Sequence, residues 1–319
     1  MIEPAPRHGL REVRPGSDSH AVVVLHGIRQ TAQDVRPFAE MMSDRLHGPR
    51  ILVYGYDHTH ALVRNGRVLH ERLERELPKG RIDLVGYSMG GLVARLAASE
   101  DAASRIHTVV TLATPNRGSL SNTELTALGQ IGRQAFETLL SPLIPRSEGV
   151  KDLTKAREIM RRRRKRLMNG DRAFTLDGDK RRYVSIPALW YSEDKAVFQF
   201  GPSLTMSGLM AAFKLAALKV KLEAMKKSHD GIVTENSNNL TLADGNDWAE
   251  FHLTKPGASK APPLCHAVID DCDQHDHMSV LREEAVAELV CALIDTADWR
   301  NLKTDRPGLV NARLHPFDI

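Results

Sequence analysis

The amino-acid sequence predicts an α/β fold in which a mostly parallel sheet of about six strands is flanked by helices on both faces. Two observations predict it. Short apolar runs alternate with stretches of helical spacing or composition from residue 21 onward, and one of these runs leads through a glycine-rich turn directly into a helix. A chain of 319 residues can bury one full core of this kind. We therefore expect a single domain over 1–319.

The apolar runs and the stretches between them give the order of the elements. The expected strands are 21–25, 51–54, 82–85, 106–112, 183–190 and 264–269. The expected helices are 35–46, 62–77, 92–98 and a closing helix over 280–294.

Two stretches, 116–182 and 191–229, are too long for the short connections of such a sheet, and both have helical composition. We expect them to form helical cap insertions. Within the second, residues 204–225 carry two apolar stripes separated by lysines. A helix with two apolar sides must bury both of them against apolar partners. It is therefore either an internal helix of the cap or a mobile lid whose second side contacts lipid or an acyl chain.

Charge and composition are ordinary for a globular chain. The net charge is +4 with 42% hydrophobic residues, and this balance predicts no nucleic-acid partner. Much of the excess positive charge lies in one run, RRRRKR at 161–166. Such a run is either a solvated helix face or a contact for anionic lipid or substrate head groups, which would bring the protein transiently to a membrane surface.

The cysteines and the N-terminus bear on location. Cys265, Cys272 and Cys291 form no paired framework and no CxxC motif, which favours free thiols in a reducing compartment. The first residues lack the apolar stretch of a signal peptide, and no later run approaches a membrane span of about 18 apolar residues. The sequence predicts a cytoplasmic protein, although secretion without a cleaved signal would leave the same sequence.

The strongest chemical motif is GYSMG at 86–90, a GxSxG pattern between an apolar strand and a helix. A nucleophilic serine, Ser88, must occupy a strained turn so that its hydroxyl stands clear of the sheet. Side chains on either side would collide with that turn, and Gly86 and Gly90 avoid the collision. The helix start also directs the N–H of Met89 toward the oxygen that becomes negative during attack.

An earlier strand supplies a second donor. Residues 22–28 read VVVLHGI, a strand that runs straight into His-Gly and a turn. We assign the second N–H of an oxyanion hole to Ile28. His26 is open to two interpretations, a residue that shapes this loop by hydrogen bonding or a catalytic base.

Three segments together resemble α/β-hydrolase lipases and esterases: residues 22–28, the turn at 86–91, and ATPNRGS at 113–119. The likeness is greatest to bacterial lipases and to the group that includes lecithin-cholesterol acyltransferase-like and inositol-deacylase-like enzymes. Many of these have ATPHxGS in the third segment, so Asn116 stands where they have His. The resemblance covers about 21–119 well and the last third only through short motifs.

The resemblance implies a Ser-acid-His order along the chain, with the base in a loop after the last strand and before the closing helix. His275 and His277 fit that place. The ending of related esterases, Asp-His followed by a small polar residue and a helix, favours His277. The acidic cluster at 270–277 lacks the regular spacing of a zinc or calcium site, so we expect no metal and no cofactor.

For the acid, SHDGIV at 228–233 resembles the DGxV turn that carries the catalytic aspartate in many lipases. This favours Asp230. Asp194 is the alternative, because it follows the strand at 183–190 closely, as the acid does in hydrolases without an insertion.

These residues predict a serine carboxylic-ester hydrolase, a lipase or esterase that works through a Ser-His-Asp triad and an acyl-enzyme. The expected substrate is an acyl ester or a lipid, and phospholipids belong to that class. Two alternatives stay open: an acyltransferase with the same triad, and a non-catalytic interaction protein on a hydrolase scaffold. The sequence indicates no oligomeric state.

Overall fold

The structure is a computed structural model of the chain. It describes residues 8–101, 105–116, 118, 147–156, 158–160, 182–188, 233, 235–238, 264–269, 277, 279–296 and 312–317.

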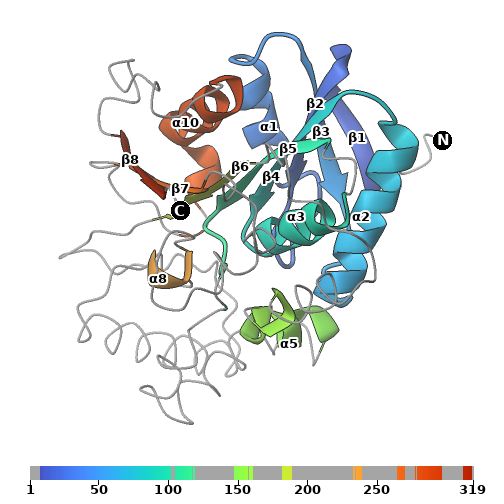
Figure 1. The fold of residues 1–319 in the computed structure, drawn as a ribbon, viewed down its shortest axis with the longest axis vertical. Coiled ribbons are helices and arrows are strands. Elements are labelled where there is room, and N and C mark those ends of the chain that lie inside the picture. Colours follow the sequence, from blue (N-terminus) through green and yellow to red (C-terminus); the bar gives the residue numbers. More distant parts are fainter. Residues whose placement is uncertain are drawn as a thin grey trace, which may run out of the picture.

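Within these residues the strands form one twisted sheet in the order β1-β3-β2-β4-β5-β6-β7-β8 (Figure 1). The bounds are β1 (Gly9–Arg14), β2 (Ser17–Leu25), β3 (Pro49–Gly55), β4 (Arg81–Tyr87), β5 (Ile106–Leu112), β6 (Arg182–Ile186), β7 (Leu264–Ile269) and β8 (Ala312–Phe317). The six inner strands run parallel to one another. The two edge strands are antiparallel, β1 to β3 and β8 to β7. The predicted mostly parallel sheet is confirmed.

Helices cover both faces of the sheet. Their bounds are α1 (Arg36–Ser43), α2 (Leu62–Glu76), α3 (Met89–Glu100), α5 (Glu148–Thr154), α8 (Glu235–Asn238), the 3₁₀ turn η1 (Val280–Arg282) and α10 (Glu284–Asp295). Helices α2 and α3 pack on one face, and α1 and α10 on the other (Figure 1). None of the described helices is long and apolar enough to cross a membrane.

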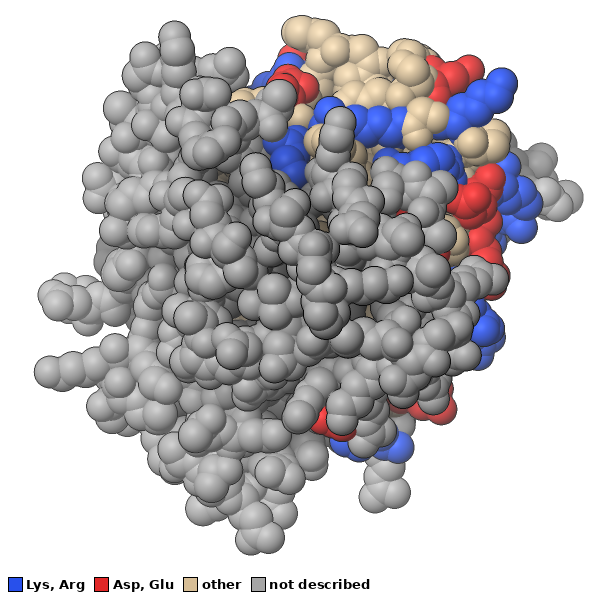
Figure 2. Space-filling model, viewed as in Figure 1, with Lys and Arg blue, Asp and Glu red and all other residues tan. Residues whose placement is uncertain are grey.

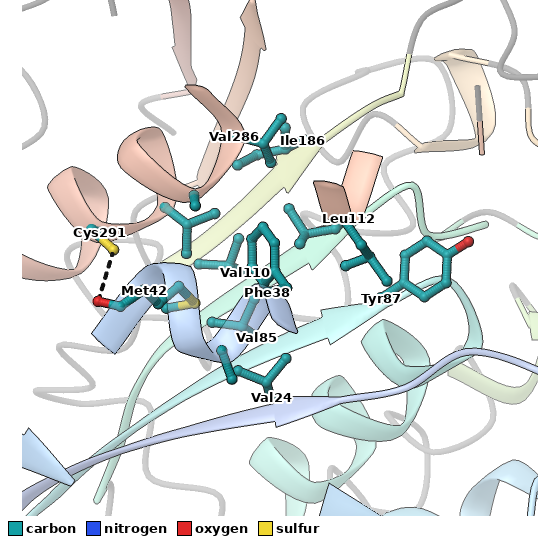
Figure 3. Close-up of a cluster of buried hydrophobic side chains, with 14 of the residues drawn as sticks. Val24, Phe38, Met42, Val85, Tyr87, Val110, Leu112, Ile186, Val286 and Cys291 are labelled. Carbon is teal, nitrogen blue, oxygen red and sulfur yellow. Dashed lines mark hydrogen bonds between the residues drawn. The ribbon is translucent and has the colours of Figure 1, made fainter. Parts of the chain in front are cut away.

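The core follows from the two-residue period of the central strands. In β2, Val23 and Leu25 join the apolar cluster under α2 and α3, whereas Val22 and Val24 join the cluster under α1 and α10. Figure 3 shows the second cluster, in which side chains from α1 and α10 close over the strands. Both faces of the inner strands are buried, as continuous apolar runs require.

The elements differ from the expected ones at four places. The edge strands β1 and β8 were not predicted, because GLREVR alternates apolar with charged residues and ARLHPF contains a proline, and neither has an apolar run. The expected closing helix is divided at Glu283, which has an extended backbone with ψ 117°. Strand β6 ends at Ile186, since Pro187 follows and has no N–H for the ladder.

Charged side chains of both signs are interspersed along the edge of the molecule where α2 lies (Figure 2). On this helix Arg67 pairs with Glu71, and Arg72 pairs with Glu76 one turn later. Such exposed i,i+4 pairs favour the helix by only a few tenths of a kcal/mol each. This surface therefore solvates α2 rather than holding the fold together.

A buried carboxylate ties the strands together at the amino edge of the sheet. Asp83 on β4 is fully buried, and it lies 2.7 Å from His20 Nε2 on β2 and 2.9 Å from an Arg81 nitrogen. His107 Nδ1 on β5 lies 3.7 Å away. Burial alone would raise the pKa of Asp83, but the His107 and His20 imidazoles and the Arg81 guanidinium outweigh it and hold the pKa well below its ordinary value.

We expect Asp83→Asn to lower the free energy of unfolding at neutral pH by about 3 kcal/mol, because it removes the buried carboxylate that the Arg81 guanidinium and the two imidazoles contact. A carboxyl with a lowered folded-state pKa stabilises the protein above its unfolded pKa of about 3.9, and this contribution is lost as the pH falls below that value. Urea unfolding at pH 7 and at pH 3 measures both effects.

The matched control is Asp18→Asn, since Asp18 is 91% exposed in its ion pair with Arg50. We expect this change to alter the stability by less than about 0.5 kcal/mol. A gap between wild type and Asp83→Asn that stayed constant into the acid range would contradict the assignment.

Candidate active site

Ser88 lies in the turn that joins β4 to α3. Its backbone has φ 51° and ψ −123°, a conformation that residues with side chains rarely adopt. The Ser88 N–H donates a 2.8 Å hydrogen bond to the carbonyl oxygen of Leu112, at the end of the neighbouring strand β5. The strained turn is therefore held in place by the sheet beside it.

The glycines around Ser88 are required by close backbone approach. A Cβ atom on Gly86 would lie 2.4 Å from Gly91 Cα, inside the turn itself. A Cβ on Gly90 would lie 2.5 Å from the carbonyl oxygen of His26, at the end of β2. In both cases the nearest atoms belong to the backbone, which cannot turn away as a flexible side chain could, so these positions favour glycine.

The structure brings His277 to the serine. Its Nε2 lies 2.9 Å from Ser88 Oγ, a hydrogen-bond distance, and both side chains are buried. His277 stands just before η1 and α10, so the closing elements of the chain carry it across to the end of β4. This is the geometry in which an imidazole takes a proton from a serine hydroxyl.

The two residues predicted to donate to an oxyanion, Met89 and Ile28, lie in the helix start and in the loop after β2. Met89 is the first residue of α3, and the N–H groups of a first helical turn point outward without intrahelical acceptors. Ile28 follows Gly27, where an added Cβ would lie 3.0 Å from Ser88 Cβ. The loop after β2 is therefore packed directly against the serine, with Ile28 half-buried beside it.

His26 shapes this loop, and its ring contacts Gly27 and Tyr56. Its Nδ1 lies 2.8 Å from the carbonyl oxygen of Gly27, and its Nε2 lies 3.2 Å from the backbone N of Tyr56, on which the ring stacks at 4.2 Å. These partners place the proton on Nδ1, because Nε2 must accept from an N–H. Burial lowers the pKa of His26 to about 4, so the ring is neutral at neutral pH.

Asn116, the residue that stands in place of His in the ATPNRGS segment, joins three elements. Its side-chain oxygen accepts a 3.0 Å hydrogen bond from Arg95 on α3. Its Nδ2 donates to Thr111 Oγ1 on β5 at 3.0 Å and to the carbonyl oxygen of Asn238 on α8 at 2.8 Å. Arg95 is buried, which lowers the pKa of its guanidinium well below the ordinary value.

The sequence reasoning assigned no role to Arg95 or α8. One signal was present, because Arg95 is the only charged residue in the apolar stretch LVARLAA of the helix that follows the nucleophile. A buried arginine needs acceptors, and here the loop after β5 supplies both the side-chain and the backbone oxygen of Asn116. Ser237 on α8 also bonds the carbonyl oxygen of Gly118 in the same loop.

Part of the first expected insertion packs on the other side of the turn. Gly149 at the start of α5 is so close to the loop after β3 that a Cβ would lie 2.1 Å from the carbonyl oxygen of His58 and 2.9 Å from Met89 Cε. Asp152 Oδ2 accepts a 2.9 Å hydrogen bond from the N–H of Leu62, the first residue of α2. This carboxylate thus caps α2 from outside the helix.

Among the described residues, one group has ligand atoms close enough for a metal ion. The side chains of His70, Glu74 and Asp101 lie within 4.8 Å of one another, between α2 and the end of α3. Glu74 is already paired with Arg105, and a guanidinium beside a cation is unfavourable. The group lies at the far end of α3 from Ser88 and has no part in the site.

Several predicted features fall outside the described residues. They are the acid Asp230, its alternative Asp194, the alternative base His275, the arginine run at 161–166 and the two-sided stretch at 204–225.

Comparison with known proteins agrees with this fold. Residues 17–133 match the family model of the PGAP1-like alpha/beta domain. The mature lipase BlEst2 from Bacillus licheniformis is similar in structure, with a TM-score of 0.53 and 18% identity over 86% of this chain and 92% of that chain. Phospholipase PlaB from Legionella pneumophila has a TM-score of 0.53 and 12% identity over 93% of this chain and 68% of that one. No curated protein sequence matches the chain.

At sequence identities this low, the structural similarity establishes a shared fold and nothing more specific. The chain has the α/β-hydrolase fold, with the strand-turn-helix at Ser88 in the place where that fold carries its nucleophile. The resemblance to α/β-hydrolase lipases and esterases, predicted from three short segments, is confirmed at this level.

His26 should make stability depend on pH in a defined window. Its folded-state pKa of about 4 lies below the ordinary 6.5, so its contribution is complete above pH 6.5 and falls, by up to roughly 3 kcal/mol, as the pH drops from 6.5 to 4. We expect His26→Gln to flatten this dependence in urea unfolding measured from pH 4 to pH 7.5.

The exposed His47 offers the matched control, and His47→Gln should keep the wild-type slope. An unchanged slope in His26→Gln would show that this imidazole is not held neutral by burial.

Proposed function

We propose that the protein is a serine hydrolase that cleaves carboxylic esters through an acyl-enzyme on Ser88. The observation that carries the proposal is the 2.9 Å separation of Ser88 Oγ and His277 Nε2 at a strained strand-to-helix turn. A serine in a merely structural turn has no need of a buried imidazole from the far end of the chain. The two groups together form the nucleophile and base of an acyl transfer.

The reaction then follows from the contacts. His277 Nε2 takes the proton of Ser88 Oγ while that oxygen attacks the ester carbonyl carbon, and the backbone N–H groups of Ile28 and Met89 stabilise the resulting oxyanion. The tetrahedral intermediate expels the alcohol, which receives the proton from His277. Water repeats the sequence on the acyl-enzyme and releases the carboxylic acid, so the chemistry needs neither a metal nor a cofactor.

We assign the acid to Asp230, and the anchoring of α8 favours this choice. Asp230 lies shortly before α8, and α8 is bonded through Asn238 and Ser237 to the loop after β5. That loop starts where Leu112 holds the Ser88 turn. The chain therefore returns to the neighbourhood of the nucleophile directly after Asp230, as a carboxylate behind the base requires.

The substrate class we propose is a lipid or another ester with an apolar acyl chain. Two similar structures are those of a lipase and a phospholipase. The apolar stripes at 204–225 are suited to bind such a chain, and the arginine run at 161–166 is suited to an anionic head group.

A fluorophosphonate probe should label the wild type and not Ser88→Ala. We expect ester turnover to fall by roughly four orders of magnitude in that variant, because the nucleophile is lost while substrate binding remains. Ser99→Ala is the matched control, since Ser99 is a buried serine on the same helix whose hydroxyl bonds the carbonyl oxygen of Leu96. Equal labelling of wild type and Ser88→Ala would refute the proposal.

The substrate class is tested with nitrophenyl esters of increasing acyl length, followed by a panel of phospholipids. We expect kcat/KM to rise with chain length, because each buried methylene contributes about 0.8 kcal/mol of transfer free energy. Turnover of acetyl and butyryl esters alone would sink the lipid assignment and leave the esterase chemistry standing.

Asp230→Asn should lower kcat by about three to four orders of magnitude, because the base loses the carboxylate that orients it and stabilises its charged form. Asp194→Asn is the matched variant and should leave kcat nearly unchanged. Steady-state kinetics on one nitrophenyl ester separates them, and the opposite outcome would move the acid to Asp194.

A further inference from the structure

Tyr87, the residue directly before the nucleophile, contacts the base as well. Its hydroxyl donates a 2.6 Å hydrogen bond to the backbone carbonyl oxygen of His277. The two rings lie 5.3 Å apart between centroids, at 41° to one another. Two adjacent residues at the end of β4 therefore contact the base. Ser88 carries the nucleophile that faces the His277 imidazole, and Tyr87 is hydrogen-bonded to the His277 backbone.

The Tyr87 ring is itself fixed. It belongs to the apolar cluster under α1 and α10, where Leu112 pairs with it across β4 and β5, and its hydroxyl points out of that cluster (Figure 3). On the other side, Gly27 leaves just enough room, because a Cβ there would lie 3.0 Å from two atoms of the ring. Tyr87 is 2% exposed.

The hydrogen bond is costly to break. A buried phenol hydroxyl is less stable without its acceptor, so this hydrogen bond favours the position in which the His277 carbonyl stays within reach. The anchor acts on the main chain of the base and leaves the imidazole free to face Ser88 Oγ. An imidazole must keep its place to within about 0.5 Å to take the proton efficiently.

We infer that Tyr87 is a positioning residue for the reaction at Ser88, which sets the place of His277 through its backbone carbonyl. The inference rests on the proposed serine-hydrolase function, and Tyr87 is not among the residues that react in it. The hydroxyl of Tyr87 is bonded to the main chain of His277, and no step of the proposed reaction uses it. Its loss should therefore slow the attack step and leave substrate binding unchanged.

The test is Tyr87→Phe, which keeps the ring and removes only the hydroxyl. We expect kcat and the second-order rate constant of fluorophosphonate labelling to fall by about tenfold to a hundredfold, with KM unchanged within about twofold. Para-aminophenylalanine at position 87 keeps both the ring and a donor, and it should restore most of the labelling rate.

The control is Tyr54→Phe, because Tyr54 is an equally buried tyrosine on β3, two strands from β4. This variant should label at the wild-type rate. A purely structural role for Tyr87 would lower the amplitude of labelling, since fewer molecules fold, while the rate constant of the folded fraction stayed at the wild-type value. That result would overturn the inference.

The outcomes separate this inference from the function on which it rests. If His277→Ala is labelled as fast as the wild type, the proposed function fails. If His277→Ala is slow and Tyr87→Phe is as fast as the wild type, only the inference fails. Should Tyr87→Phe not fold, Tyr87→Met also lacks the donor and fills the same space flexibly, and the same rate criterion applies to it.

Discussion

The backbone strain at Ser88 is the constraint on which the site depends. Holding a non-glycine residue at positive φ destabilises the fold by about 1–3 kcal/mol, and contacts with the surrounding structure must offset this energy. Here the Leu112 carbonyl fixes the turn from β5, while the backbone at the end of β2 lies so close that only glycine fits at position 90. The parallel sheet, buried on both faces, therefore acts as the rigid frame that keeps one serine hydroxyl in a high-energy place.

Buried polar groups have different partners at the amino ends and at the carboxyl ends of the parallel strands. At the amino ends of the strands, the Asp83 carboxylate lies beside His20, Arg81 and His107 from three strands, and this cluster ties the strand ends together. At the carboxyl ends of the strands, two buried side chains near Ser88, those of His26 and Tyr87, are bonded to backbone carbonyls instead. Such directional hydrogen bonds to the main chain fix the positions of the rings.

Much of the fold and part of the site could be predicted from the sequence, for physical reasons that differ by residue. The inner strands are long apolar runs because both faces are buried, and GxSxG between strand and helix identifies Ser88 by its steric demands. Strands β1 and β8 have no such signature, since an edge strand is half solvated and held mainly by backbone bonds. The contacts of Tyr87 and Arg95 were equally hidden, because their partners, His277 and Asn116, are distant in sequence and met only through the topology.

The insertions are part of the frame as well as covers for it. Helix α5 packs against Met89 and caps α2 through Asp152, on the β3 side of the nucleophile strand. Helix α8 is bonded to Asn116, on the β5 side. Because β4 lies between these two sides, α5 from the first insertion and α8, which follows the second, brace the turn at Ser88. A change that loosened either insertion would therefore reach the nucleophile through main-chain contacts, even where it left every reacting group in the sequence intact.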